Sequence, residues 1–255
     1  MKILSYGFLI GISLAYNVWA FGELSINREL SMQSNKAKEI FIDVGAGNLN
    51  VSSDNIDKVM VNAKVYSKKY DNVEELTQAF KDKMEFNLES KGSRIILKAM
   101  NKKSFFGTNN AQIAIDLEVV IPKEMNVDID DGSGDIWVTD IDGSLKIDDG
   151  SGSTLIDNIK GNVFIDDGSG NLTIRNILSS VTIDDGSGKI IMNNIQGDVA
   201  IDDGSGEVNI TQVTGDVKVD DSSGSINVND LAGHFTLIDD GSGSVYVNGQ
   251  KWHKD

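Results

Sequence analysis

The 255-residue chain contains no cysteine and only two histidines, His234 and His253. Without cysteine, a protein has no disulfide framework, no thiolate metal site and no thiol for lipid attachment. The absence of a repeated histidine also leaves no imidazole series for metal binding or base catalysis. The sequence therefore gives little support to a nucleophilic enzyme or a transition-metal protein.

Basic residues are scarce in the second half of the chain. Residues 1–128 carry 16 acidic and 16 basic side chains, whereas residues 129–255 carry 23 acidic and 7 basic ones. The formal net charge of −16, which equals 7 − 23, therefore lies entirely in the second half. Such a surface repels phosphate backbones and anionic lipids, so we expect neither nucleic acid nor an anionic membrane as a partner.

Long apolar runs are missing beyond Ala20. Residues 1–20 contain Lys2, an apolar run and the small residue Ala20 at their end, a pattern typical of a secretory signal peptide. No later apolar run approaches the length that a membrane helix needs. We predict export to the periplasm, cell surface or medium, with no transmembrane anchor after signal cleavage.

The second half of the chain repeats the phrase Asp-Asp-Gly-Ser-Gly. Its first Asp recurs with an 18-residue period from Asp130 to Asp220, and the last copy, at Asp239, comes one position late. One copy reads Asp-Asp-Ser-Ser-Gly, from Asp220 to Gly224. Within each unit, apolar pairs at i and i+2, such as Leu145/Ile147, recur twice. Side chains two apart point to the same face of a strand, so each half-unit predicts one short strand and one turn.

Two strands in a single repeat unit cannot bury their apolar side chains within one coil, so the coils must stack. We predict an all-β fold, a right-handed parallel β-solenoid with 18-residue coils of two strands and a dry aliphatic core. A triangular helix of hexapeptides is the alternative for an 18-residue period. It requires an aliphatic residue every six positions, and Ser153 and Asn171 occupy the third corner, which favours the two-strand coil.

The mature N-terminal part, residues 21–128, is predicted to be strand-rich but irregular. Residues 42–49 resemble a degenerate copy of residues 165–172, so the coil pattern begins there and is then interrupted. Apolar residues at helical spacing predict one amphipathic helix over residues 73–85, lying against the first sheet. Strands are expected at 93–99 and 112–121, before Pro122, the only proline. The regular array is expected over 129–249, with a tail over 250–255.

The ladder of short Gly-x-aliphatic-x-aliphatic strands follows two earlier features of the chain. These are an N-terminal strand with a glycine-rich turn at residues 42–49 and a strand-like run such as Leu117 to Pro122. This arrangement resembles the bacterial β-strand-repeat domain family of unknown function, often labelled as adhesin-type. The resemblance covers nearly the whole mature chain. It implies a solenoid fold and an association with the cell surface or envelope, without a defined ligand.

Stacking of the coils would align the Asp-Asp pairs in two columns, with equivalent carboxylates about 4.8 Å apart. The first Asp of each pair has the outward parity of its strand, and the second is expected at the turn. Neighbouring carboxylates at this spacing repel by about 0.9 kcal/mol in bulk water and by about 3.5 kcal/mol at an effective dielectric constant of 20. This repulsion must be offset.

One hypothesis is that Ca²⁺ or a similar hard cation bridges the carboxylates, because such ions prefer oxygen ligands. The other is that each Asp caps its turn by accepting N–H bonds from the following Gly-Ser-Gly. The candidate metal ligands are the seven pairs Asp130, Asp131, Asp148, Asp149, Asp166, Asp167, Asp184, Asp185, Asp202, Asp203, Asp220, Asp221, Asp239 and Asp240. The residues predict no other cofactor.

Polar and aromatic residues alternate with the predicted core on one face, in a column that begins at Trp137 and ends at Tyr246. Such a ladder could bind a glycan or another envelope component, or it could simply be a solvated sheet. The sequence thus predicts a secreted, non-enzymatic binding scaffold of the envelope or cell surface. The alternatives are a carbohydrate-active β-helix protein and a structural element that associates end to end through its uncapped last coil.

Overall fold

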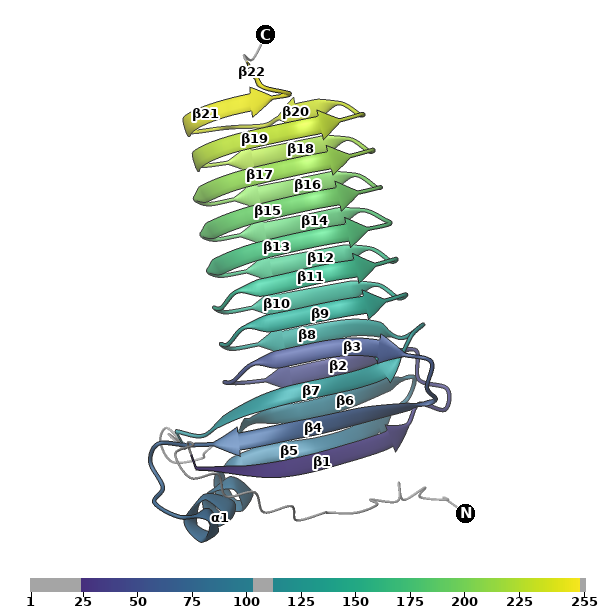
Figure 1. The fold of residues 1–255 in the computed structure, drawn as a ribbon, viewed down its shortest axis with the longest axis vertical. Coiled ribbons are helices and arrows are strands. Elements are labelled where there is room, and N and C mark those ends of the chain that lie inside the picture. Colours follow the sequence, from purple (N-terminus) through teal and green to yellow (C-terminus); the bar gives the residue numbers. More distant parts are fainter. Residues whose placement is uncertain (1–23, 103–111, 253–255) are drawn as a thin grey trace.

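The computed structural model describes residues 24–102 and 112–252 (Figure 1). The predicted signal peptide therefore lies outside the described residues. Two sheets face each other along the length of a rod. In the order of their strands, the 12-stranded sheet contains β1 (Ser25–Gln33), β4 (Lys58–Tyr66), β7 (Ala114–Pro122), β3 (Leu49–Asp54), β9 (Ile136–Ile141), β11 (Thr154–Ile159), β13 (Gly170–Ile177), β15 (Gly188–Ile195), β17 (Gly206–Val213), β19 (Ser223–Leu231), β21 (Ser242–Val247) and β22 (Gln250–Lys251).

The opposite sheet has ten strands and contributes the second strand of each coil. Its order is β20 (Phe235–Leu237), β18 (Val217–Asp221), β16 (Val199–Asp203), β14 (Val181–Asp185), β12 (Val163–Asp167), β10 (Leu145–Asp149), β8 (Asn126–Asp131), β2 (Glu39–Val44), β6 (Arg94–Asn101) and β5 (Met84–Lys91). Odd-numbered strands from β9 to β21 thus alternate with even-numbered strands across the rod.

The coils stack in register, and each strand pairs in parallel with its equivalent in the next coil. Leu145 pairs with Val163, and Thr154 pairs with Leu172, so the partners are one repeat apart in both sheets. In Figure 1 the near strands run from left to right and the far strands return while the chain climbs, which makes the coil right-handed. The predicted parallel β-solenoid with two strands per coil is confirmed.

The core is aliphatic along the whole array because the i, i+2 pairs of both sheets point inward. Ile147 and Ile156, from facing strands, are fully buried. A third buried series, such as Ile159, follows a residue with left-handed backbone, Asn158, whose φ is 61°. That conformation interrupts the alternation of the strand and turns Ile159 inward at its end. Asn and Asp tolerate it better than most residues.

The first coil of the repeat lies out of chain order. Strands β2 and β3 form a coil that stacks under β8 and β9, with Ile42 paired to Ile129 and Leu49 paired to Ile136. Below this coil lie β6 and β7, which follow it in the sequence. The degenerate copy predicted at residues 42–49 is therefore a true coil, and the chain inserts a second coil beneath it before the array begins.

The lower end of the rod is closed by antiparallel strands and one helix (Figure 1). Strands β1 and β4 extend one sheet, β5 extends the other, and α1 (Val73–Lys83) contacts β1 and β5. The helix begins after Asn72, whose side chain accepts a hydrogen bond from the Glu75 N–H. The predicted helix is confirmed, but it ends at Lys83 because Met84 already belongs to β5. It covers the end of both sheets rather than the face of one.

The upper end departs from the repeat because the last interval contains one extra residue. Strand β20 has only three residues, and its register with β18 ends at Val219 and Leu237. At this end the ring of Trp252 packs edge-on against Phe235, with ring centroids 5.7 Å apart. Among the described residues, no helix is long and apolar enough to cross a membrane.

Substitution of Gly188 by alanine tests the stacking of the coils. A Cβ atom on Gly188 would lie 1.5 Å from the carbonyl oxygen of Gly170 in the coil below, and Gly188 has a φ of 154°. We expect Gly188→Ala to lower the free energy of unfolding by about 2–4 kcal/mol, as measured by urea denaturation. The neighbouring exposed residue gives the control, because Ser187→Ala should change it by less than about 0.5 kcal/mol. Equal effects of the two variants would contradict the close approach.

Candidate functional site

The Asp-Asp pairs form one column outside the rod and one inside it. In each even-numbered strand from β8 to β18, the first Asp of the pair follows an inward aliphatic residue and lies on the outer side, while the second is the last residue of the strand and is buried. We call the exposed or half-exposed set the outer column: Asp130, Asp148, Asp166, Asp184, Asp202 and Asp220. The buried set, the inner column, is Asp131, Asp149, Asp167, Asp185, Asp203 and Asp221, each at most 3% exposed.

The inner column departs from the prediction, which placed the second Asp at the turn. The strand continues one residue further than expected, so the alternation of inward and outward side chains also includes this Asp. Each inner carboxylate nevertheless caps its turn. Its Oδ1 accepts a hydrogen bond from the backbone N–H of the serine two residues later, at 3.0 Å for both Asp167 and Asp185. The turn-capping interpretation is thus confirmed for the inner column.

At both ends of the array the two columns differ in membership from the seven Asp-Asp pairs that the sequence predicts. Asp43 pairs in register with Asp130 and extends the outer column downward, whereas Val44 takes the inner position beside Asp131. The degenerate phrase at residues 42–49 was the signal that could have identified Asp43 as a member. At the upper end the extra residue keeps Asp239 and Asp240 out of strand β20. Burial raises the pKa of Asp221, and Asp240 lies close enough to raise it further.

The second oxygen of the inner carboxylates lacks polar partners. Within the described part of the chain, the buried Oδ2 atoms of Asp131, Asp167, Asp185, Asp203 and Asp221 accept no hydrogen bond. The exception is Asp149, whose Oδ2 accepts a bond of 3.4 Å from the Thr154 hydroxyl. Thr154 occupies an inward position that is aliphatic or aromatic in the other pairs of the array. Its hydroxyl is a hydrogen-bond partner of the Asp149 carboxylate, which explains why a polar residue stands there.

Burial changes the acidity of the inner column. Removal from water, together with repulsion from neighbouring carboxylates, raises the pKa of Asp131 and Asp185 to about 7 and that of Asp167 and Asp203 to about 6. Burial also raises the pKa of Asp149, although the Ser151 N–H and the Thr154 hydroxyl oppose the shift.

The hypothesis that the Asp pairs bind Ca²⁺ stays a prediction. Within residues 24–102 and 112–252, no group of three or more His, Asp or Glu side chains is arranged to hold a metal ion. The inner column already has a structural role in the turns. Among the described residues, no Lys, Arg or His forms an ion pair with the six carboxylates of the outer column.

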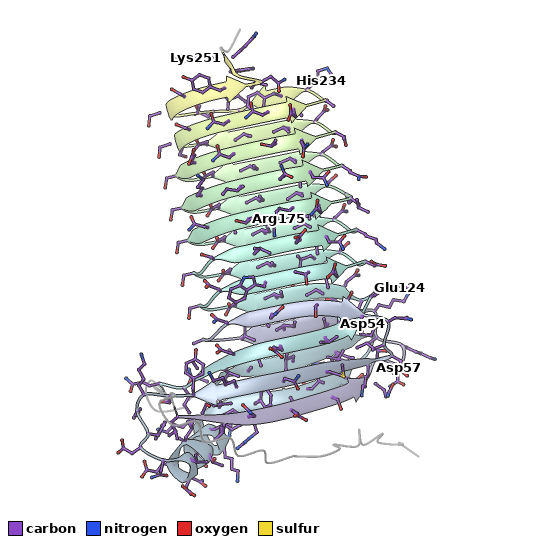
Figure 2. The ribbon with its side chains drawn as sticks, viewed as in Figure 1. Asp54, Asp57, Glu124, Arg175, His234 and Lys251 are labelled. Atoms are coloured by element: carbon purple, nitrogen blue, oxygen red, sulfur yellow. The ribbon has the colours of Figure 1, made fainter. Side chains whose placement is uncertain are left out.

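The opposite sheet carries a face whose charges are paired. On the outer surface of β9 to β21 we call two columns the amide face: Trp137, Leu155, Thr173, Ile191, Asn209, Asn227, Tyr246 and Thr139, Asp157, Arg175, Asn193, Thr211, Asn229. Figure 2 shows Arg175 on this face, and its guanidinium lies 3.1 Å from the Asp157 carboxylate, so the two charges of these columns neutralise each other. In the column beside them Lys189 and Glu207 form a further ion pair of 2.7 Å. The Asn227 amide donates to the Asn209 oxygen at 3.1 Å. Ile191 and Tyr246 are each 39% exposed.

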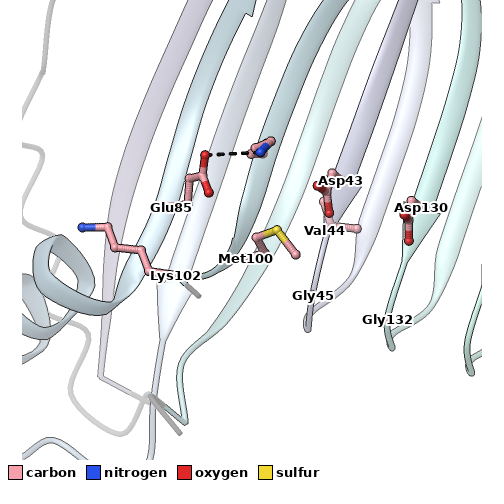
Figure 3. Close-up of a pocket in the computed structure, with 9 residues that line it drawn as sticks. Asp43, Val44, Gly45, Glu85, Met100, Lys102, Asp130 and Gly132 are labelled. Atoms are coloured by element: carbon pink, nitrogen blue, oxygen red, sulfur yellow. Dashed lines mark ion pairs between the residues drawn. The ribbon is translucent and has the colours of Figure 1, made fainter. Parts of the chain in front are cut away.

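A groove of about 880 Å³ lies where the outer column meets the lower coils (Figure 3). Asp43 and Asp130 stand on one wall, and Glu85, which forms an ion pair of 3.5 Å with Lys98, stands on the other. Met100 lies between the walls. Residues 103–111, which include Phe105 and Phe106, lie outside the described residues.

Catalytic chemistry finds little support in these surroundings. A glycosidase requires two carboxyls with separated pKa values in a pocket that holds the substrate. The Asp157–Arg175 pair lies on an exposed sheet face, with the Arg175 side chain 45% exposed. His234 is 93% exposed and lies 3.3 Å from Asp216 in a turn. His253 is outside the described residues.

Comparisons with known proteins identify a family. The sequence model of the Toastrack DUF4097 family matches residues 30–236. No curated protein matches the chain. Similar solved structures include a putative lipid binding protein from Parabacteroides distasonis ATCC 8503, with 14% identity, a TM-score of 0.49, and coverage of 86% of this chain and 96% of that one.

Two further solved structures are similar at the same level. One is a putative adhesin from Bacteroides fragilis NCTC 9343, with 13% identity, a TM-score of 0.45, and coverage of 88% and 97% of the two chains. The other is a putative cell adhesion protein from Clostridium sporogenes ATCC 15579, with 13% identity, a TM-score of 0.40, and coverage of 84% and 100%.

The contact between Thr154 and Asp149 predicts a pH-dependent variant. Thr154→Val removes the hydroxyl that stabilises the Asp149 carboxylate, so the pKa of Asp149 in the folded state should rise further above its ordinary value. The folded state then loses more stability as pH rises from about 4. Relative to the wild type, we expect Thr154→Val to be about 1 kcal/mol less stable at pH 8 than it is at pH 4.5 in urea denaturation.

The exposed residue Thr182 provides the matched control for this variant. Thr182→Val makes the same chemical change on the outer surface of β14, so its effect should be the same at both pH values. A Thr154→Val effect that is also independent of pH would show that the hydroxyl does not act on the Asp149 carboxylate.

Proposed function

The chain belongs to the Toastrack DUF4097 family, and on that premise we propose that it is an exported, non-enzymatic scaffold that binds an uncharged glycan of the cell envelope or cell surface. The amide face of the 12-stranded sheet would be the binding surface. The observation that carries the proposal is the neutrality of this face in a protein with a net charge of −16. Export is supported by the signal-peptide pattern of residues 1–20.

The chemistry of the amide face matches that of a neutral glycan. Asparagine amides and threonine hydroxyls both donate and accept hydrogen bonds, as sugar hydroxyls do. Trp137, Ile191 and Tyr246 add apolar surface, and aromatic rings with polar tips suit a partner that is apolar on one side and polar on the other. In the two columns of this face no fixed charge is left unpaired, so a neutral ligand would not have to remove water from an uncompensated ion.

The repeat also matches a polymer in its geometry. Each coil presents equivalent positions again about 4.8 Å further along the rod. A ligand with its own regular repeat would meet similar groups at successive steps, so weak contacts would add along its length. The parallel hydrogen bonds between coils hold these positions in fixed register, which limits the loss of side-chain and backbone freedom on binding.

We propose binding without catalysis because successive coils present the same groups in the same surroundings. The outer column repeats one carboxylate in one setting, and the amide face has a single exposed Asp157–Arg175 pair. Neither arrangement separates an acid from a base in a pocket, as bond cleavage would require. A glycan bound along the amide face would therefore be held and not cut.

Affinity electrophoresis of the mature protein in gels containing uncharged polysaccharides tests this proposal. We expect one of these polymers to retard the protein. Thr211→Asp/Asn229→Asp places two carboxylates on the amide face and should weaken binding by about tenfold or more, because the new ions must lose water on contact. Both positions are at least partly exposed.

The control introduces the same charges on the other sheet. Thr182→Asp/Thr236→Asp lies on the outer surface of β14 and β20, where both residues are exposed, and should leave the retardation unchanged. Sedimentation of the protein alone at several concentrations separates glycan binding from end-to-end self-association. Absence of retardation by every uncharged polymer, equal loss in both variants, or shortening of a bound polymer would contradict the proposal.

A further inference from the structure

We propose that the inner column is a proton-binding ladder, which holds neutral carboxylic acids inside the rod and makes the fold more stable under mildly acidic conditions than at neutral or alkaline pH. The inference concerns the six buried aspartates from Asp131 to Asp221. It does not depend on the glycan proposal, because the ladder lies inside the rod while the amide face lies outside it.

The geometry of the ladder begins with stacking. Asp149 pairs in register with both Asp131 and Asp167, and the register continues through Asp185 to Asp203 and Asp221. Neighbouring carboxyls are therefore about one strand spacing, or about 4.8 Å, apart. All six are at most 3% exposed. Water cannot screen the repulsion between carboxylates in such a position as it does at the surface.

Hydrogen bonding reaches only one oxygen in five of the six carboxyls, Asp149 being the exception. One oxygen accepts the turn N–H, from Ser169 to Asp167 and from Ser205 to Asp203 for example. The other oxygen is buried without a partner in five of the six residues. A buried charged oxygen with no donor is costly, whereas a protonated carboxyl carries no charge and gains a donor of its own.

Among the described residues, the charged groups that shift the pKa values of the ladder are all acidic. Within the column, Asp149 acts on Asp131 and Asp167, Asp167 and Asp203 act on Asp185, and Asp221 acts on Asp203. From the outer column and the adjoining turns, the groups are Asp130, Asp135, Asp148, Asp166, Asp184, Asp202, Asp220 and Asp240. No Lys, Arg or His of the described chain forms an ion pair with the ladder.

These surroundings set the direction of the pH dependence. Burial raises the pKa of four of the six carboxyls to about 6 or 7, above the ordinary value of 3.8. Between about pH 4 and pH 7 the folded state therefore binds more protons than the unfolded state. Stability from the ladder is fully present below about pH 4, falls as pH rises through this window, and stays low above it.

A titration of the wild-type protein tests the proposal directly. Infrared spectroscopy distinguishes a protonated carboxyl from a carboxylate by its carbonyl stretching band. With EDTA present at constant ionic strength, we expect folded protein at pH 5.5 to show the protonated band, and the band to disappear toward pH 8. The midpoint of thermal unfolding should fall by at least about 5 °C between pH 5 and pH 8.

Two matched triple variants separate the ladder from the general negative charge. Asp167→Asn/Asp185→Asn/Asp203→Asn replaces three inner carboxyls by neutral groups of the same shape, whose carbonyl can still accept the serine N–H. It should lose most of the protonated band and flatten the dependence of the midpoint on pH. Asp166→Asn/Asp184→Asn/Asp202→Asn removes three outer charges and should keep both the band and the pH dependence.

The proposal would be overturned by wild-type protein that shows no protonated carboxyl band at pH 5.5, or by an outer-column variant that removes the pH dependence as fully as the inner one. A rise in the wild-type midpoint with millimolar Ca²⁺, absent with matched NaCl and lost in the inner variant, would also overturn it, since the carboxyls would then hold a metal. If the inner variant does not fold, the titration of the wild type still decides.

Discussion

The in-register hydrogen bonding between successive coils is the constraint on which the other features depend. Strands in both sheets pair with their own copies one repeat later, and at the turn the backbone of Gly188 comes so close to that of Gly170 that no side chain fits between them. The coils can therefore neither slide nor rotate relative to each other. As a consequence, each position of the repeat is stacked on a copy of itself, and the sequence repeat becomes a set of columns.

Stacking on a copy has different consequences for different side chains. Aliphatic residues bury each other, which stabilises the rod. Amides both donate and accept, so they can bond to their own copies, as Asn194 does with Asn176 at 2.7 Å. A carboxylate only accepts, so its copy offers repulsion and no hydrogen bond. Repetition therefore lowers the stability of the rod at the Asp columns. The repulsion between their carboxylates must be offset by turn N–H groups, protons or solvent ions.

Much of this architecture follows from periodicity. The 18-residue repeat and its apolar pairs predicted the two sheets, the parallel register and the core, because burial leaves few alternatives for such a pattern. The helix was predictable from its apolar spacing and charged ends. The repeat signal occurs many times along the chain, and the helix signal lies within one short segment.

Other features could not be predicted because they depend on a single residue or on a distant pairing. A strand that ends at Asp148 places the second carboxyl at the turn, whereas a strand that includes Asp149 places it in the core. Sequence patterns do not locate strand ends to within one residue, so they could not distinguish these two cases. The inward turn of Ile159 depends on the left-handed conformation of Asn158. The placement of β6 and β7 under β2 and β3 required pairing between segments far apart in the chain, for which the irregular segment carries no repeat signal.

The ends of the rod show how the costly columns are terminated. At the lower end Val44 replaces the inner Asp, so the buried ladder stops at an apolar residue, while Asp43 continues the exposed column into the groove beside Glu85 and Lys98. At the upper end the extra residue moves Asp239 and Asp240 out of the strand, and Asp240 still acts on Asp221. Asp131 and Asp221, at the two ends of the ladder, are as deeply buried as the members between them, although each has an identical neighbour on one side only. Burial is the largest cause of the raised pKa of every member. The acidity of the inner column therefore follows from the buried position of the last residue of each strand more than from the number of coils.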